Sequence, residues 1–437
     1  MKSARMIVCE LLEKLEKSAY SNLALDGVLQ SSDFSARDKA FISRLFYGVI
    51  ERKATLDYII SLYSSKPIQK LDTVILETLR MGIYQLLYMD SVPDNAAVNE
   101  SVELVKQLGK KSAAPFVNAV LRSFIRDDKK FALPKDKLKK FCVEYSCSSE
   151  LAERLIKQYG EEKASEFLKR SLEPHKLYLR VNNTRSDCGS LIAEFEKDNI
   201  VVKKCDILDN CLEANPFGSV ENNELFKKGY YHVQDLSSQL CCAALEPKKG
   251  DKILDICSAP GGKAFTITEI TGDECELYAC ELHDKRVKLI KSGAERLGLK
   301  SIKALQNDAK VFNESFPQFD KILCDVPCSG TGVIRSKPEI KYSDLNKFDS
   351  LPKIQYDILN TASKYLKIGG ELVYSTCTVL KEENELVVDK FLKENKNFEG
   401  VPFLAYIGAP FGDHKASIIA ESFDCEGFFI SKIRRIN

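Results

Sequence analysis

The amino-terminal part of the chain repeats its apolar residues at the spacing of amphipathic helices. In the stretch VILETLRMGIYQLLYM (residues 74–89), five apolar side chains fall on one face of a helix, and PFVNAVLRSFIR (residues 115–126) repeats the pattern. Pro115 stands at a position where proline favours the first turn of a helix. The pattern predicts an all-α bundle over residues 1–134.

The pattern changes after this bundle. Residues 135–175 are again helical but strongly charged, which is typical of a connector with one or two helices. The segments LYLRVN, IVVKK and YYHVQ are β-like, and a helical stretch near residues 190–198 separates the first two. Together they predict that residues 135–235 hold a helical connector and a small α+β unit.

From residue 250 onward, short apolar runs alternate with helical segments. The candidate strands are KILDIC (252–257), ELYACEL (276–282), KALQND (303–308), DKILCD (320–325) and GELVYSTC (370–377). This alternation predicts an α/β domain over residues 236–437, with the doubly wound, Rossmann-like parallel sheet of such folds. The last twenty residues predict a β-hairpin around Gly427 that adds an antiparallel strand.

Composition supports an ordinary multidomain globular protein. The chain has 437 residues, of which 44% are apolar and 29% charged, and no apolar run reaches the roughly 18 to 20 residues of a membrane span. The first residues carry charges throughout, unlike a signal peptide. The 15 cysteines include no CxxC pair and there are only four histidines, so neither a disulfide framework nor a metal site is indicated. We expect a cytoplasmic monomer that neither associates with a membrane nor binds a metal.

The net charge of +1 hides an uneven distribution. Residues 1–180 contain 30 basic and 24 acidic side chains, whereas residues 181–437 contain 34 and 39. Lys and Arg near phosphates favour binding by releasing counterions, so the basic first part is consistent with a polyanionic partner. Solvated helix faces explain the same excess equally well.

Candidate binding residues follow the first three strands. In LDICSAPGGKAF, Pro260 stiffens the turn, and two glycines let the backbone approach a ligand before a helix begins at about Lys263. An acid ending the second strand can accept both ribose hydroxyls, and one ending the third could meet an adenine amino group. Carboxylates repel phosphates, so S-adenosylmethionine, with its cationic sulfonium, fits better than a nucleotide. The predicted cofactor-binding residues are Cys257, Ser258, Ala259, Pro260, Gly261, Gly262, Lys263, Glu281, Asp308 and Asp325.

The fourth and fifth strands end near thiols. Asp325 and Cys328 follow one strand in DVPCSGTGVIR, and Cys377 follows the other in YSTC. Adjacent strands lie about 5 Å apart, so both thiols can open into one crevice. Addition of a thiolate to carbon 6 of cytosine would make carbon 5 nucleophilic enough to accept a methyl group, with Asp325 placed as the acid for nitrogen 3. One cysteine would attack and the other would assist release, and spacing alone does not decide which does which.

These motifs carry a resemblance to a known family. LDICSAPGGK, DVPCSGTGVIR, KPEIKY and YSTCTVLKEEN resemble the RNA (cytosine-5) methyltransferases of the NOL1/NOP2/Sun family. The amino-terminal half is similar to the NusB-like RNA-binding domain fused to one bacterial branch of it. The resemblance implies a 5-methylcytosine at position 967 of 16S rRNA, with that RNA or a small-subunit assembly precursor as the partner. It also implies that Cys377 is the nucleophile, that Cys328 helps release the product, and that Asp325 contacts both the cofactor and the base.

The resemblance further suggests RNA contacts. Arg180 and Asn182 resemble the start of the family's small RNA-recognition unit, and Arg335 and Lys337 could contact phosphates flanking the target. A solvated surface is the competing explanation for each basic residue. Glu426 stands where relatives commonly have aspartate, which leaves its role open.

Two other functions remain possible at this level. An RNA amino-group methyltransferase could use DVPC as its substrate loop, but it would leave Cys377 without a task. A non-catalytic RNA-binding or antitermination-like factor would need only the helical half, and neither the acidic strand ends nor the thiols.

Overall fold

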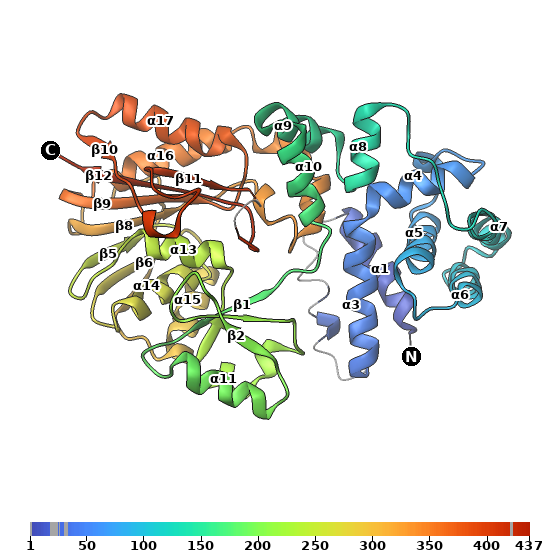
Figure 1. The fold of residues 1–437 in the computed structure, drawn as a ribbon, viewed down its shortest axis with the longest axis horizontal. Coiled ribbons are helices and arrows are strands. Elements are labelled where there is room, and N and C mark those ends of the chain that lie inside the picture. Colours follow the sequence, from blue (N-terminus) through green and yellow to red (C-terminus); the bar gives the residue numbers. More distant parts are fainter. Residues whose placement is uncertain (1, 18–24, 26, 30–33, 420–422) are drawn as a thin grey trace. The chain divides into compact units, whose positions relative to one another are not determined.

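The computed structural model describes residues 2–17, 25, 27–29, 34–419 and 423–437, and the chain forms two compact units (Figure 1). Unit 1 comprises Met1–Leu172 and Lys337–Asp344, and unit 2 comprises Glu173–Ser336 and Leu345–Asn437. A short segment of the carboxy-terminal half thus belongs to the helical unit, which the sequence did not predict. The three-part division at residues 134 and 235 stays a prediction.

Unit 1 is helical, as the apolar spacing predicted. Pro115 lies in the first turn of helix α7, and Leu79, Ile83 and Leu121 are among the side chains in the buried core of this unit. The helices described in it include α1 (Ala4–Lys17), α3 (Ala36–Glu51), α4 (Lys53–Tyr63), α5 (Thr73–Tyr88), α6 (Asp94–Gln107), α7 (Ala114–Arg126), α8 (Lys137–Tyr145), α9 (Ser149–Tyr159) and α10 (Glu161–Arg170).

The charged connector holds three helices, α8 to α10, where one or two were expected. Asp136 and Ser148 each cap a new helix by accepting a backbone N–H in its first turn. Gly160, with φ of +82°, separates α9 from α10. Caps and a left-handed glycine therefore divide what the apolar spacing alone presented as one or two segments.

Unit 2 begins with the predicted α+β fold. Strands β1 (Leu177–Val181), β2 (Val202–Lys204), β3 (Cys211–Ala214) and β4 (Tyr231–Val233) form an antiparallel sheet in the order β2-β3-β1-β4. Helix α11 (Cys188–Lys197) packs Leu191 and Phe195 into the same core. Strand β3 was not predicted, and the short helix α12 (Glu224–Lys227) precedes β4.

The second sheet has the predicted parallel strands. Strands β5 (Lys252–Asp255), β6 (Glu276–Glu281), β7 (Ile302–Gln306), β8 (Phe319–Asp325) and β9 (Leu366–Thr376) lie in the order β9-β8-β5-β6-β7. The chain runs outward from β5 to β7 and then returns to the other side of β5 with β8. The strand order therefore reverses between β5 and β8, and ligands of such sheets bind beyond the carboxyl ends at this point.

Antiparallel strands complete this sheet at one edge. The predicted terminal hairpin is present, because β11 (Lys415–Ile418) pairs with β12 (Phe428–Arg435), and β12 also pairs with β9. Residues 420–422 of its connection lie outside the described residues. A further short strand, β10 (Phe398–Gly400), pairs with β12 on the edge opposite β9, next to the stretch that pairs with β11. This strand was not predicted.

Helices cover both faces of the second sheet (Figure 1). Helices α13 (Leu236–Ala244), α14 (Gly262–Ile270) and α15 (Asp284–Leu297) pack on one face, and α16 (Leu351–Ser363) and α17 (Glu385–Glu394) on the other. Successive strand residues alternate between the two cores, since Ile253 belongs to the first and Leu254 to the second. None of the helices in the described ranges has the length and apolarity of a membrane span.

A buried ion cluster joins β8, β9 and β12. The carboxylate of Glu371 lies 2.6 Å from Lys321, 3.1 Å from Lys432 and 2.8 Å from Arg434. Burial alone would raise the pKa of Glu371, but these three cations outweigh burial and hold the pKa at about 2. Since the unfolded value is about 4.3, the carboxylate adds stability above that pH, and the contribution is lost as the pH falls toward 2.

We expect Glu371→Gln to lower the free energy of unfolding at pH 7 by about 3 kcal/mol, because the buried Lys321 loses its counter-charge and Lys432 keeps only the exposed Glu246, 3.0 Å away. Denaturant unfolding at pH 7 and at pH 3 measures the effect, which should be smaller at pH 3. Glu399→Gln is the matched control, because this exposed carboxylate lies 3.9 Å from Arg434. An equal loss of stability in both variants would contradict the assignment.

Candidate active site

The loop after β5 has the geometry of a ligand cradle. Gly261 has φ of +112°, and a Cβ atom there would lie 2.4 Å from the ring of Phe265, so only glycine fits. Helix α14 begins at Gly262, one residue before the predicted start. The Ser258 N–H donates to the Cys280 carbonyl at 2.7 Å, which fastens the loop to β6. The backbone can therefore approach a ligand at the helix amino terminus.

Buried polar groups without protein partners lie under this loop. Asp255 is 1% exposed, and neither its carboxylate oxygens nor the Ser258 hydroxyl has a hydrogen-bond partner among the described residues. Burial raises the pKa of Asp255 to about 7. Because buried polar groups ordinarily have partners, the loop fits a ligand that supplies donors, such as the ammonium group of the predicted cofactor.

Glu281, the residue predicted to bind the ribose hydroxyls, pairs with an arginine that the sequence motifs did not indicate. Arg286 lies 3.0 Å from the Glu281 carboxylate and donates to the Ala259 carbonyl at 2.8 Å, so it ties the cradle to the end of β6. The third acid, Asp308, follows β7 and accepts the backbone N–H of Lys310 at 3.0 Å. Both acids lie at carboxyl ends of strands, as predicted. Their roles toward a cofactor stay predictions.

A lysine and an aspartate form an ion pair at the switch point. Lys263 Nζ lies 2.7 Å from Asp325 Oδ2, and the Ser375 hydroxyl donates to Oδ1 at 2.9 Å. Burial by itself lowers the pKa of Lys263, but the Asp325 carboxylate outweighs burial and the net pKa is raised. A proton donated to a nucleobase at this site would come from the Asp325–Lys263 ion pair and not from an isolated carboxylic acid. The acid role predicted for Asp325 would therefore be shared with Lys263.

The two predicted thiols meet. Strands β8 and β9 are parallel neighbours with Asp325 beside Ser375, and the Sγ atoms of Cys328 and Cys377 lie 3.1 Å apart. The hydrogen bond to Cys377 and burial raise the pKa of Cys328 well above its usual value. The raised pKa favours the thiol form of Cys328, and the geometry allows either sulfur to donate the hydrogen bond. By contrast, Cys324 is fully buried inside the sheet as a small apolar residue.

A buried carboxylate that sequence reasoning did not single out lies behind the thiols. Glu383 accepts hydrogen bonds from the residues that directly follow each cysteine, Ser329 and Thr378. The only signal in the sequence was its place in the motif YSTCTVLKEEN, six residues after Cys377. Spacing along the chain does not reveal that its side chain turns back to the loop after β8.

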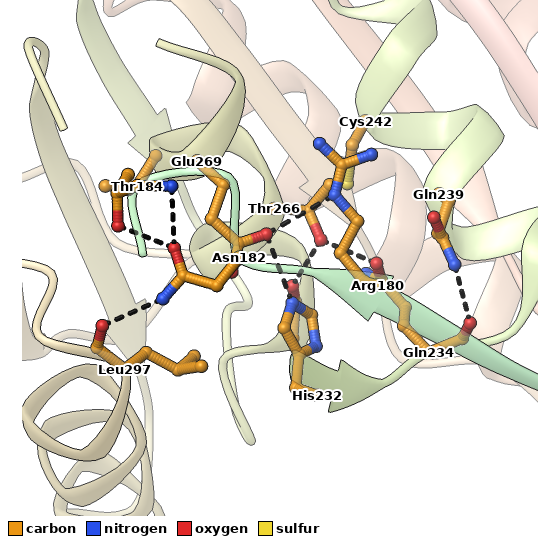
Figure 2. Close-up of polar contacts among 12 residues, drawn as sticks. Arg180, Asn182, Thr184, His232, Gln234, Gln239, Cys242, Thr266, Glu269 and Leu297 are labelled. Atoms are coloured by element: carbon orange, nitrogen blue, oxygen red, sulfur yellow. Dashed lines mark hydrogen bonds and ion pairs between the residues drawn. The ribbon is translucent and has the colours of Figure 1, made fainter. Parts of the chain in front are cut away.

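Arg180 and Asn182, for which RNA contacts were predicted, are buried and form hydrogen bonds within the protein, which disfavours direct contact with RNA (Figure 2). Arg180 is 4% exposed, and its Nε donates to the buried Glu269 carboxylate at 3.3 Å. Asn182 is fully buried, and its amide donates to the carbonyls of Gly229 and Leu297 at 2.9 Å each. Both residues join the small sheet to α14 and α15. Their polarity indicated a surface only because local sequence does not show burial.

Arg335, also predicted to contact RNA, has its hydrogen-bond donors occupied by protein groups. Its guanidinium pairs with Asp424 at 2.5 Å and donates to the carbonyls of Glu173 and Pro174. The side chain is only 9% exposed, so its donors serve the protein interior. Lys337 is exposed and belongs to unit 1, and its RNA contact stays a prediction.

Glu426 stabilises the loop that follows Cys328 in the chain. Its carboxylate accepts the Ser336 N–H at 3.1 Å, and its own N–H donates to Asp235 at 3.3 Å. Burial, reinforced by the neighbouring charge of Asp235, raises the pKa of Glu426 to about 7. The next residue, Gly427, donates its N–H to the Gly332 carbonyl at 2.9 Å. The residue left open by the sequence thus connects the terminal hairpin to the active-site loop.

Three family profiles match successive parts of the chain. The profile of the 16S rRNA methyltransferase RsmB/F matches residues 242–434, that of the NusB family matches residues 2–126, and a ferredoxin-like domain of RsmF/B-like methyltransferases matches residues 149–221. They agree with the α/β, all-α and α+β folds described above.

Curated relatives match over the whole length. A probable ribosomal RNA small subunit methyltransferase B of Bacillus subtilis (strain 168) is 37% identical over 445 residues, covering 99% of both chains. One from Synechocystis sp. is 30% identical and covers 100% of both. The crystal structure of PH0851 has a TM-score of 0.84 at 23% identity, covering 100% of this chain and 99% of that one. NSun6 from Pyrococcus horikoshii with SFG has a TM-score of 0.62 at 24% identity, covering 66% and 98%. These two likenesses concern the fold.

Proposed function

This chain belongs to the RsmB/F family of 16S rRNA methyltransferases, and from that premise we propose that it methylates carbon 5 of a cytosine in 16S rRNA, with S-adenosylmethionine as the methyl donor. The observation that carries this proposal is the pair of thiols 3.1 Å apart beside the Asp325–Lys263 ion pair. An amino-group methyltransferase has no use for two thiols at that place.

Cys377 is the nucleophile in this proposal. Its thiolate adds to carbon 6 of the cytosine, and the ring becomes an enamine whose carbon 5 can take a methyl group. Loss of the carbon 5 proton then expels the thiolate and restores the double bond. Cys328 suits the role of assisting release, because its Sγ lies 3.1 Å from that of Cys377 and its thiol can donate a hydrogen bond to the departing thiolate.

The Asp325–Lys263 pair serves the ring during attack. Thiolate addition places negative charge on the ring, and a hydrogen bond or proton at nitrogen 3 stabilises that charge. Asp325 orients toward this task because Ser375 and Lys263 each hold one of its oxygens. Lys263 keeps positive charge close to the reacting ring.

The cradle after β5 suits the methyl donor. Bound there, S-adenosylmethionine would supply an electrophilic methyl group. Residues 257–263 would hold its amino acid part with backbone groups, and Asp255 would meet its ammonium group. Glu281, held by Arg286, would accept the ribose hydroxyls, and Asp308 would face the adenine.

A base must leave its stack to reach the thiols, so an unpaired loop or an assembly precursor of the small subunit is the better substrate. The test is incubation of Cys328→Ala with small-subunit RNA and S-adenosylmethionine, followed by denaturing electrophoresis. We expect a covalent protein–RNA adduct, because the attacking thiol remains while release is impaired. Digestion of the wild-type product to nucleosides should yield 5-methylcytidine by mass spectrometry.

The double variant Cys328→Ala/Cys377→Ala is the control, and its adduct should be absent. An adduct that survives without Cys377 would overturn the choice of nucleophile. A product methylated on the exocyclic amino group, with no adduct in any variant, would favour the amino-group alternative.

A further inference from the structure

Glu383 is a buried carboxylate placed between the two cysteine loops. It ends the short helical turn η7 (Lys381–Glu383) after β9 and is 2% exposed. Its Oε2 accepts the Ser329 N–H at 3.0 Å, and its Oε1 accepts the Ser329 hydroxyl at 2.5 Å. The hydroxyl of Thr378 donates to Oε1 at 3.3 Å. Because Ser329 follows Cys328 and Thr378 follows Cys377, one carboxylate binds the neighbours of both thiols.

A glutamine extends this connection to the other side of Cys328. Gln355, on α16, donates from Nε2 to the Glu383 carboxylate at 2.8 Å and to the Pro327 carbonyl at 2.9 Å. Pro327 precedes Cys328 and Ser329 follows it, so the cysteine is held on both sides. The Ser329 and Thr378 hydroxyls also lie 2.8 Å apart. The two loops are thus joined by one buried network that is centred on Glu383.

Backbone and side-chain contacts both join the two cysteine loops. Regular pairing between β8 and β9 ends with Asp325 beside Ser375, and beyond it the Gly332 N–H donates to the Cys377 carbonyl at 2.9 Å. Side chains add the Glu383 network and the Thr331 hydroxyl, which lies 2.7 Å from the Thr378 hydroxyl. Among these side chains, Glu383 contacts the residues that follow both cysteines, so the separation of the two sulfurs depends in part on this carboxylate.

We propose that Glu383 is a positioning residue that holds Cys328 and Cys377 in register, so that one thiol attacks while the other stays beside it for release. The two-thiol division of labour rests on the function proposed above. The register itself does not, because it can be measured without RNA or cofactor. The negative charge of Glu383 also favours retention of the proton by Cys328.

The register is tested by the rate at which the two thiols form a disulfide with diamide. Each disulfide forms as two thiols pass two electrons and two protons to one diamide, and peptide mapping of the alkylated protein identifies the Cys328–Cys377 bond. We expect Glu383→Ala to slow this step about 10-fold or more, because small displacements of reacting groups cost effective concentration. Glu383→Gln keeps an acceptor oxygen and should show an intermediate rate.

Glu382→Gln is the matched control, because it changes a half-exposed neighbour in the same turn. Circular dichroism checks that every variant is folded. If Glu383→Ala does not fold, the rate of Glu383→Gln decides the test. A folded Glu383→Ala protein that forms the disulfide at the wild-type rate would overturn the proposal.

Methylation kinetics supply the second readout. Loss of register should lower kcat with little change in KM for RNA, whereas a purely structural role would not separate the two constants. If wild-type protein makes no 5-methylcytosine yet the disulfide rates differ as expected, the proposed function fails and the positioning role stands.

Discussion

Replacing Cys377 with alanine should reduce methylation turnover by about 10⁴-fold or more, the scale on which removal of a nucleophile acts in other enzymes. The variant loses the sulfur that adds to the ring, and burial and the charge of Glu383 still disfavour a thiolate at Cys328, so Cys328 should not take its place readily. Transfer of radiolabelled methyl groups to small-subunit RNA measures the loss. Binding of the methyl donor, followed by calorimetry, should be unchanged because the cradle after β5 is intact.

Cys275→Ala is the control for this experiment. Cys275 is also half-buried but precedes β6, at the opposite end of the sheet from the thiol pair, and turnover should be unchanged. If Cys377→Ala retained measurable turnover while Cys328→Ala abolished it, the two thiols would have to exchange roles.

Asp325→Asn should lower kcat by about 10²- to 10⁴-fold, the range attributed to general acid–base catalysis. The variant keeps the shape of the side chain but removes the charge that pairs with Lys263. Lys263 then remains largely buried without its counter-charge, so its raised pKa should fall, and the proton source at the ring is disturbed. Single-turnover kinetics on RNA separate this chemical step from RNA binding.

Ser375→Ala tests whether the charge or the orientation of Asp325 matters more. It removes the hydroxyl that donates to Oδ1 and leaves the ion pair in place. We expect a loss of about 10- to 100-fold, consistent with one hydrogen bond to a charged carboxylate. An Asp325→Asn variant no slower than Ser375→Ala would exclude the proposed role of the carboxylate at nitrogen 3.

The burial of two of the residues predicted to contact RNA could not be inferred from the sequence, whereas the positions of the cradle residues could. Arg180 and Asn182 are polar residues on a short strand, and nothing nearby in the chain shows that Glu269 and Leu297 cover them. The glycines and the proline of the cradle determine the conformation of their own backbone, so the turn could be predicted from the local sequence. A buried arginine is recognised only when its partner is known.

The sequence by itself determined most of the strands, the turn after β5 and the residues at the strand ends, because apolar spacing and backbone-restricting residues act over a few positions. Only the tertiary structure decided which side chains meet. Lys263 and Asp325 are 62 residues apart, Ser329 and Glu383 are 54 apart, and Arg180 and Glu269 are 89 apart. Such pairs form when strands and helices pack, and the free energy of that packing is shared among residues that no local pattern connects.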